Sequence, residues 1–176
     1  CSIEGATRGI VGNYCISPIV NKPLIAHQFE YLQRNKIQHV ILKTDPEYVN
    51  QLKDIYAMGE RWGVKIQYID NVEELFLEDS ENEKFVILKS ALLQNLQIDD
   101  FYQQFVTSGK DIAVAIPSDN NAYNLQQYPI MCNKKGLQYY FSNTYSENEI
   151  LPLYLSYSLV HIDSDQAFFE FNQQVL

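Results

Sequence analysis

The sequence predicts a single α/β domain, residues 1–176, with a mostly parallel mixed sheet, helices on both faces of the sheet and a β-rich C-terminal part. Short apolar runs alternate with helical patterns through most of the chain, which is typical of βαβ units. From Tyr128 onward the pattern changes mainly to strands. No repeat, low-complexity tract or glycine- and serine-rich linker divides the chain, and 176 residues suit one hydrophobic core.

Helices are predicted from apolar spacing and from the residues at their ends. Pro23 suits the start of a first helix, and Asp45-Pro46 suits the cap and first residue of a second. Asp99 and Asp100 precede a third helix, which Gly109 ends, and a last helix begins near Asp165. The apolar stripes comprise Ile25, Phe29 and Leu32, then Val49, Leu52, Ile55 and Tyr56, and finally Phe101 and Phe105.

Strands are predicted where short runs are apolar throughout or alternate between apolar and polar residues. These runs are His39–Leu42, Val64–Ile69, Phe85–Leu88, Ile112–Ile116, Tyr128–Met131, Leu137–Phe141 and Leu155–Ile162.

Charge and composition exclude several classes of partner. The net charge of −9 and pI near 4.7 argue against nucleic acid, whose affinity for proteins depends on Lys and Arg. No basic amphipathic stretch, apolar run of transmembrane length or signal-peptide pattern is visible, so we expect no membrane partner. Cys1, Cys15 and Cys132 are scattered and odd in number, which favours reduced thiols and a cytoplasmic location.

Five segments, in the right order, resemble the sugar-phosphate nucleotidylyltransferase (pyrophosphorylase) family. Pro18–Ile25 is similar to the segment that joins the family's signature loop to its first long helix. The other four are Tyr31–Leu42, Arg61–Tyr68, Phe85–Phe101, where the strand normally ends in a metal-binding Asp, and Leu153–Asp163, which resembles a late strand lining the sugar pocket. The resemblance implies the Rossmann-like GT-A/nucleotidylyltransferase fold.

The resemblance also implies a reaction with clear electrostatic requirements. A sugar phosphate attacks the α-phosphorus of a nucleoside triphosphate and expels pyrophosphate, so the site needs cations and backbone N–H donors around the phosphates. In the family, a Gly-rich loop ending in Thr-Arg, a Lys and Mg²⁺-binding Asp residues supply them. Gly5, Thr7 and Arg8 resemble the end of that loop, and together with Lys22 they are candidates for a vestigial nucleotide-binding site.

Other positions depart from the family pattern. The expected Lys falls on Tyr14 and the expected metal-binding Asp on Ala91, so both catalytic positions are lost. Ile3-Glu4 replaces the paired glycines of the loop, where side chains block a close approach of phosphate to the backbone. A Glu-Lys pair expected after the strand at 137–141 falls on Ser142-Asn143, and a short acidic loop, Asp70–Glu83, replaces the recognition insert.

These losses favour a catalytically degenerate domain without catalytic residues, bound metal or cofactor. We expect it to act as a regulatory, scaffold or partner-binding module, with a protein partner or a second copy of itself, and with a nucleotide or sugar phosphate as a further candidate ligand. Two alternatives remain. One is an active sugar-1-phosphate nucleotidylyltransferase that requires Mg²⁺. The other is a GT-A glycosyltransferase that relies on Asp163 and Asp165, although these acids also suit a helix cap.

The remaining polar and aromatic clusters favour ordinary structural roles. His27, His39 and His161 show no ligand spacing, so we expect satisfied or exposed histidines. The acidic run suits a solvated loop or a docking surface for a basic partner, and the tyrosine-rich stretch mixes core and surface positions. The acidic run comprises Glu73, Glu74, Glu78, Asp79, Glu81 and Glu83, and the tyrosines are Tyr139, Tyr140, Tyr145, Tyr154 and Tyr157.

Overall fold

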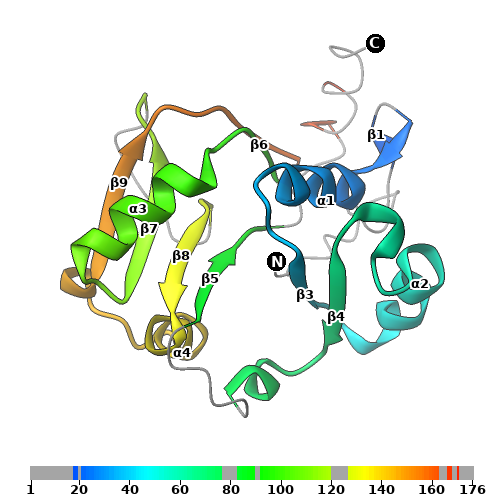
Figure 1. Cartoon of the computed structure of the whole chain (residues 1–176), viewed down its shortest axis with the longest axis horizontal. Coiled ribbons are helices and arrows are strands. Elements are labelled where there is room, and N and C mark those ends of the chain that lie inside the picture. The colour runs from blue at the N-terminus through cyan, green and yellow to red at the C-terminus, as the bar shows by residue number, and fades with distance from the viewer. Residues whose placement is uncertain are drawn as a thin grey trace. The chain divides into compact units, whose positions relative to one another are not determined.

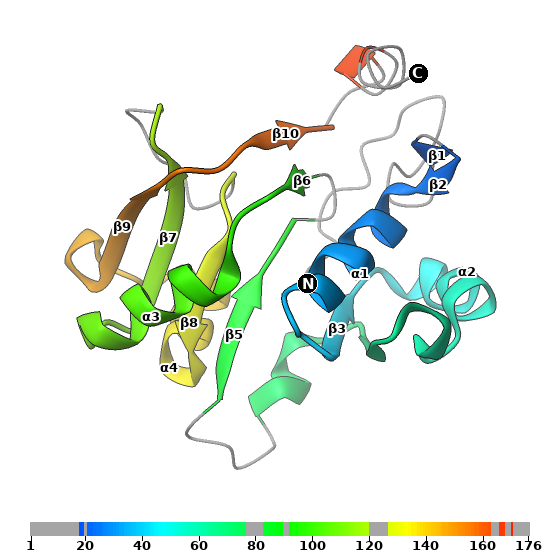
Figure 2. The same cartoon turned by 45° about the horizontal axis from the view of Figure 1, so that its top comes forward.

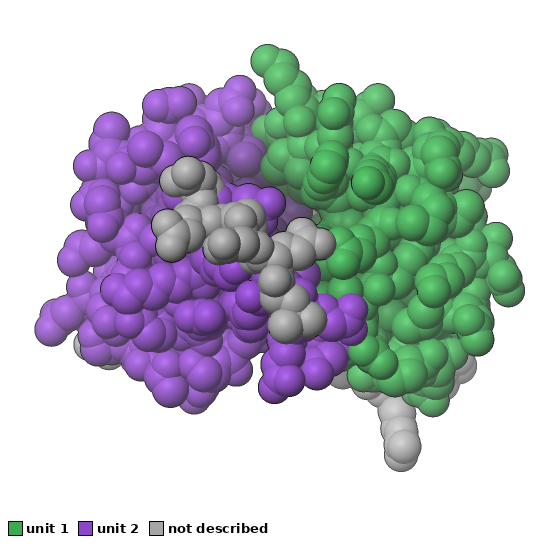
Figure 3. Space-filling model, turned by 60° about the horizontal axis from the view of Figure 1, so that its bottom comes forward, with its two compact units in different colours: residues 1–70, 89–95, 159–176 green, residues 71–88, 96–158 purple. Residues whose placement is uncertain are grey.

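A computed structural model describes residues 18–19, 21–76, 83–89, 92–119, 127–162, 166–167 and 170. The chain divides into two compact units, which Figure 3 distinguishes by colour. Unit 1 comprises residues 1–70, 89–95 and 159–176, and unit 2 comprises residues 71–88 and 96–158.

The described residues of unit 1 form three pairs of strands and several helices (Figures 1 and 2). In chain order its elements are β1 (Pro18–Ile19), β2 (Lys22–Pro23), α1 (Leu24–Arg34), β3 (His39–Lys43), α2 (Pro46–Tyr56), the 3₁₀ helix η1 (Glu60–Trp62), β4 (Lys65–Ile69), β6 (Leu92–Gln94) and β10 (Leu159–His161). Strands β3 and β4 are parallel, whereas β1 pairs with β2, and β6 with β10, in antiparallel fashion.

The core of unit 1 forms beneath α1. The apolar residues of α1 recur at helical spacing, so Ile25, Phe29 and Leu32 lie on one side of the helix and are all buried, as the sequence predicts. The ring of Phe29 lies edge-on to Tyr56 of α2, with ring centroids 5.4 Å apart, and Trp62 of η1 packs near both rings. These aromatic contacts join three elements that the chain order separates.

Unit 2 is built on a four-stranded mixed sheet in the order β5-β8-β7-β9. Its elements are the 3₁₀ helix η2 (Val72–Phe76), β5 (Lys84–Ile87), α3 (Ile98–Ser108), β7 (Ile112–Pro117), β8 (Ile130–Asn133), α4 (Lys134–Ser142), the 3₁₀ helix η3 (Glu147–Glu149) and β9 (Ile150–Leu155). Strand β7 runs parallel to β9, and β8 is antiparallel to both β5 and β7.

Both faces of the unit 2 sheet are covered at its centre. Successive side chains of a strand point to opposite faces, and all six residues of β7 are buried. Helix α3 lies along one face of the sheet (Figures 1 and 2), and its Phe101 and Phe105 are buried. The helix begins at Ile98, so Asp99 and Asp100 lie in its first turn, where carboxylates suit the helix dipole. It ends at Gly109 in the left-handed conformation, as predicted.

One predicted strand is wrong. Leu137–Phe141 belongs to helix α4, because the side chain of Asn133 accepts a hydrogen bond from the backbone N–H of Gly136 and caps the helix start. Leu137 and Tyr140, three residues apart, share the buried side of this helix. A short apolar run fits either a strand or a helix, and the cap decides between them here.

Other boundaries also differ from the predictions. Strand β8 begins at Ile130, two residues later than predicted, after Pro129, which has no N–H to donate to a strand ladder. The segment 155–162 is not one strand, because β9 ends at Leu155 and β10 begins at Leu159 in a different sheet. Ile55, predicted in the apolar stripe of α2, is 47% exposed.

The predicted mixed α/β fold is confirmed in the described residues. Gln166, Ala167 and Glu170 are helical, which agrees with the predicted last helix, although Asp165 itself lies outside the described residues. Within the described part of the chain, every helix is too short or too polar to cross a bilayer.

Candidate functional site

Most positions that the family resemblance singles out lie outside the described residues. These are Gly5, Thr7, Arg8, Tyr14 and Ala91, together with Asp163 and Asp165 of the glycosyltransferase alternative. Their roles stay predictions from the sequence. Lys22 and the strand that precedes Ala91 are described, and they show what surrounds two parts of the expected site.

The ammonium of Lys22 already has an anionic partner. Lys22 lies in β2, and its Nζ donates to Oε1 of Glu30 on α1, the helix that follows β2. The hydrogen bond from Lys22 lowers the pKa of the Glu30 carboxyl, against the opposing effect of its partial burial. A phosphate near Lys22 would therefore have to compete with this carboxylate.

The end of β5 carries no carboxylate. The strand ends at Ile87, and the chain contains no Asp or Glu from Phe85 to Ile98. Beyond the strand, the backbone carbonyl of Lys89 accepts a hydrogen bond of 2.8 Å from the side chain of Gln28 on α1. This segment therefore supplies no acidic side chain for Mg²⁺, which binds oxygen ligands.

Ser142 and Asn143 do not follow a strand, contrary to the prediction. They end helix α4, where the hydroxyl of Ser142 donates to the carbonyl of Gln138 at 2.7 Å. Asn143 caps the helix in the left-handed conformation, with φ of 55°. Both residues therefore have a structural role at a helix end, and the comparison with a family Glu-Lys pair at a strand end does not apply to them.

The described residues contain no cluster of three or more His, Cys, Asp or Glu side chains that could hold a metal ion. The Nε2 atom of His27 lies 2.9 Å from the carbonyl oxygen of Ile19, and His39 is exposed at the start of β3. Both histidines thus match the ordinary roles expected of them. The side chain of His161 is outside the described set.

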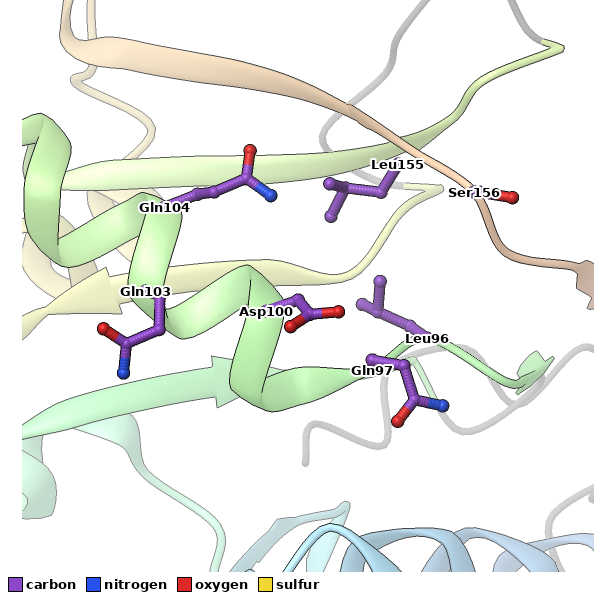
Figure 4. A pocket seen from close by; sticks show the side chains of 7 residues that line it. All are labelled: Leu96, Gln97, Asp100, Gln103, Gln104, Leu155 and Ser156. Carbon is purple, nitrogen blue, oxygen red and sulfur yellow. The ribbon is translucent and has the colours of Figure 1, made fainter.

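A pocket of about 280 Å³ lies within unit 2, between α3 and the end of β9 (Figure 4). Leu96 and Leu155 supply the apolar part of its lining. The polar part consists of Gln97, Asp100, Gln103, Gln104 and Ser156. Because Leu155 ends a strand of a parallel pair, the pocket lies at the carboxyl edge of that pair, where α/β folds commonly bind ligands.

Leu155 and Ser156 belong to the segment Leu153–Asp163, which resembles a strand that lines the family's sugar pocket, but no sequence pattern indicated the side of this pocket that α3 supplies. Asp100 was expected only near a helix start, and the three glutamines near and along α3 were not singled out. Their spacing was visible in the sequence, but only the tertiary structure brings Leu155 and Ser156 beside them.

Comparisons with known proteins agree with this architecture. No protein-family profile and no curated protein sequence matches the chain. Among solved structures, HddC from Yersinia pseudotuberculosis complexed with GMP-PN has a TM-score of 0.71 at 10% identity, over 99% of this chain and 97% of that one. A protein described as a glucose-1-phosphate thymidylyltransferase, from Bacillus anthracis in complex with a sucrose, has a TM-score of 0.68 at 12% identity, over 92% of this chain and 86% of that one.

A third solved structure broadens the set of similar folds. The 4-diphosphocytidyl-2C-methyl-D-erythritol synthase from Anaerococcus prevotii has a TM-score of 0.68 at 11% identity, over 99% of this chain and 95% of that one. At these identities the likeness establishes the fold alone, a mixed α/β fold that the chain shares with these three solved structures. It does not establish an activity.

Proposed function

We propose that this chain is a catalytically degenerate nucleotidylyltransferase-like domain that acts as a regulatory, scaffold or partner-binding module. The observation that carries the proposal is the lack of any carboxylate in the segment after β5. The family resemblance expects a metal-binding Asp at Ala91, and the chain has no carboxylate from Phe85 to Ile98. Lys89 adds a positive charge near that position, which would repel Mg²⁺.

The environment of Lys22 supports the same proposal. A site for a triphosphate needs cations that are available to the phosphates, and the ammonium of Lys22 is held by Glu30. The expected second cation is replaced by the phenol of Tyr14. Removing one comparable charge-stabilising donor costs roughly two to three orders of magnitude in rate, so several losses together leave little activity.

A protein partner or a second copy of the chain fits the surface of unit 2. Tyr154 on the edge strand β9 is 54% exposed, and Tyr102 and Val106 are exposed together on α3. Aromatic side chains of this kind are enriched in protein–protein interfaces. These exposed residues support a binding role for unit 2.

The alternative of an active nucleotidylyltransferase has one specific support. The chain covers 97% of the HddC structure, which contains the nucleotide analogue GMP-PN. An active enzyme would have to draw its cations and metal ligands from positions other than Lys22 and the end of β5. The glycosyltransferase alternative depends on Asp163 and Asp165, which lie outside the described residues.

Release of pyrophosphate tests the proposal directly. The purified chain is incubated with Mg²⁺, each of the common nucleoside triphosphates and a set of hexose 1-phosphates, beside an active thymidylyltransferase as positive control. We expect no release above the reaction without protein. Pyrophosphate release that EDTA abolishes would show an active enzyme and refute the proposal. Calorimetric titration of the same nucleotides without turnover measures any residual binding separately.

A further inference from the structure

The outer edge of β9 has no partner strand among the described residues of unit 2. The sheet order β5-β8-β7-β9 places β9 at one end, and Figures 1 and 2 show it as an outermost strand of this sheet. An edge strand presents a row of backbone N–H and C=O groups with which a strand of another molecule can pair. The pairing of β9 with β7 determines which of its residues present these groups.

The backbone groups of β9 point alternately toward β7 and toward the outer edge. The carbonyl of Leu155 accepts a hydrogen bond of 3.0 Å from the N–H of Ser118, directly after β7, so the backbone groups of Leu155 face β7. Because these directions alternate along a strand, the backbone groups of Leu153 also face β7. Those of Pro152 and Tyr154 face the outer edge.

Apart from Pro152, the sequence of β9 favours pairing between chains. All of its residues from Ile150 to Leu155 are uncharged, and Tyr154 is 54% exposed. Segments of about six residues with high β-propensity, low charge and no proline pair readily with strands of other chains. Native sheets protect such edges with charged side chains or with proline. Since β9 has no charged residue, Pro152 is the residue of this strand that can protect its edge.

Pro152 is exposed and lacks the N–H that strand pairing requires at this position. In a symmetric antiparallel pair of two β9 strands centred near Pro152, each copy would lack one backbone donor in the middle of the pair. We propose that Pro152 closes this edge to a second copy of the chain, which would otherwise add its own β9 as a further strand. The partner of the proposed function then contacts unit 2 through side chains such as that of Tyr154. The inference does not depend on the loss of catalysis.

The variant P152T tests this role, because its restored N–H points away from β7 and leaves the bonds between β7 and β9 in place. Sedimentation equilibrium should show a self-association constant roughly tenfold higher than that of the parent, since each copy regains a backbone hydrogen bond. Amide exchange measured by NMR locates the contact. The N–H of Tyr154 should become protected in concentrated P152T and stay unprotected in the concentrated parent. The N–H of Leu153, which faces β7, should be protected in both.

The matched control is P46T, which makes the same change at the exposed first residue of helix α2, where no strand edge is altered. It is expected to associate like the parent. If P152T fails to fold, which circular dichroism would reveal, P152A restores the same N–H without a branched side chain. Association of P152T that matches the parent, an equal rise in P46T, or protection of the Tyr154 N–H in the concentrated parent would each overturn the proposal. Because pyrophosphate release is measured separately, failure here leaves the proposed function untouched.

Discussion

A β-carbon on Gly136 would lie 2.0 Å from the backbone carbonyl oxygen of Asp111. The start of α4 therefore touches the backbone just before β7, and only glycine allows that approach. We expect Gly136→Ala to lower the free energy of unfolding by about 1–3 kcal/mol, as overpacking does. Urea denaturation measures the change. Gln138→Ala, on the exposed side of the same helix, should change it by less than about 0.5 kcal/mol, and equal effects would contradict the prediction.

The side chain of Asn133 makes two contacts at the same place. Its Oδ1 caps α4 at the N–H of Gly136, and its Nδ2 donates to Oδ1 of Asp111 at 2.7 Å. Asn133→Ala should therefore cost about 1–2 kcal/mol of stability. Asn133→Asp keeps the cap but sets a second carboxylate against Asp111. Its stability deficit, measured by urea denaturation, should shrink in acid; a deficit that is independent of pH would argue against this arrangement.

Asp111 should also make stability depend on pH. Burial acts to raise the pKa of its carboxyl, but hydrogen bonds from Lys135 and Asn133 outweigh burial and lower the pKa below its ordinary value of 3.8. A depressed folded-state pKa adds stability above 3.8, and this stability is lost as the pH falls through the lower folded value. Urea denaturation between pH 7 and pH 2 should show a smaller acid loss in Asp111→Asn than in the parent. An unchanged acid loss would exclude this role, and Asp54→Asn, an exposed carboxylate on α2, serves as control.

Cys132 should be unreactive in the folded protein. It is fully buried in β8, and burial raises the pKa of its thiol, so the reactive thiolate is scarce. With Cys1 and Cys15 replaced by serine, Cys132 is the one remaining thiol. Its alkylation by iodoacetamide should be negligible without denaturant and should follow the unfolding curve in urea. Rapid alkylation under native conditions would contradict the burial of this residue.

The ion pair of Lys22 and Glu30 allows a test of residual nucleotide binding. If Lys22 belongs to a vestigial site, as its sequence position predicts, Glu30→Gln releases its ammonium and should strengthen binding of a nucleoside diphosphate. Lys22→Ala should weaken binding of the same nucleotide. Each substitution should change the affinity roughly twofold to fivefold, which is the range expected for a solvent-exposed charge pair. Calorimetric titration at low salt measures both. If both variants bind like the parent, Lys22 has only a structural role.

Local patterns predicted much of the fold. The stripe of Ile25, Phe29 and Leu32 identified α1, and the six apolar or small residues of Ile112–Pro117 identified the central strand β7. These predictions succeed because helix and strand periodicity depends on residues close in the sequence. Burial of the apolar face that this periodicity creates stabilises the helix or strand. The sequence likewise shows that Ala91 has no carboxylate and Tyr14 no amine at the positions where the family resemblance expects them, because this concerns residue identity and not geometry.

The sequence by itself determined which segments are amphipathic, where glycine and proline interrupt them, and which charges the expected catalytic positions lack. Only the tertiary structure decided that Leu137–Phe141 is helical, that β8 lies between β5 and β7, and that Leu155 meets Gln104 at a pocket. These features depend on contacts between residues far apart in the chain, such as the approach of Gly136 to Asp111. Local periodicity does not predict such contacts, because they form, and stabilise the fold, only when segments distant in the sequence pack together.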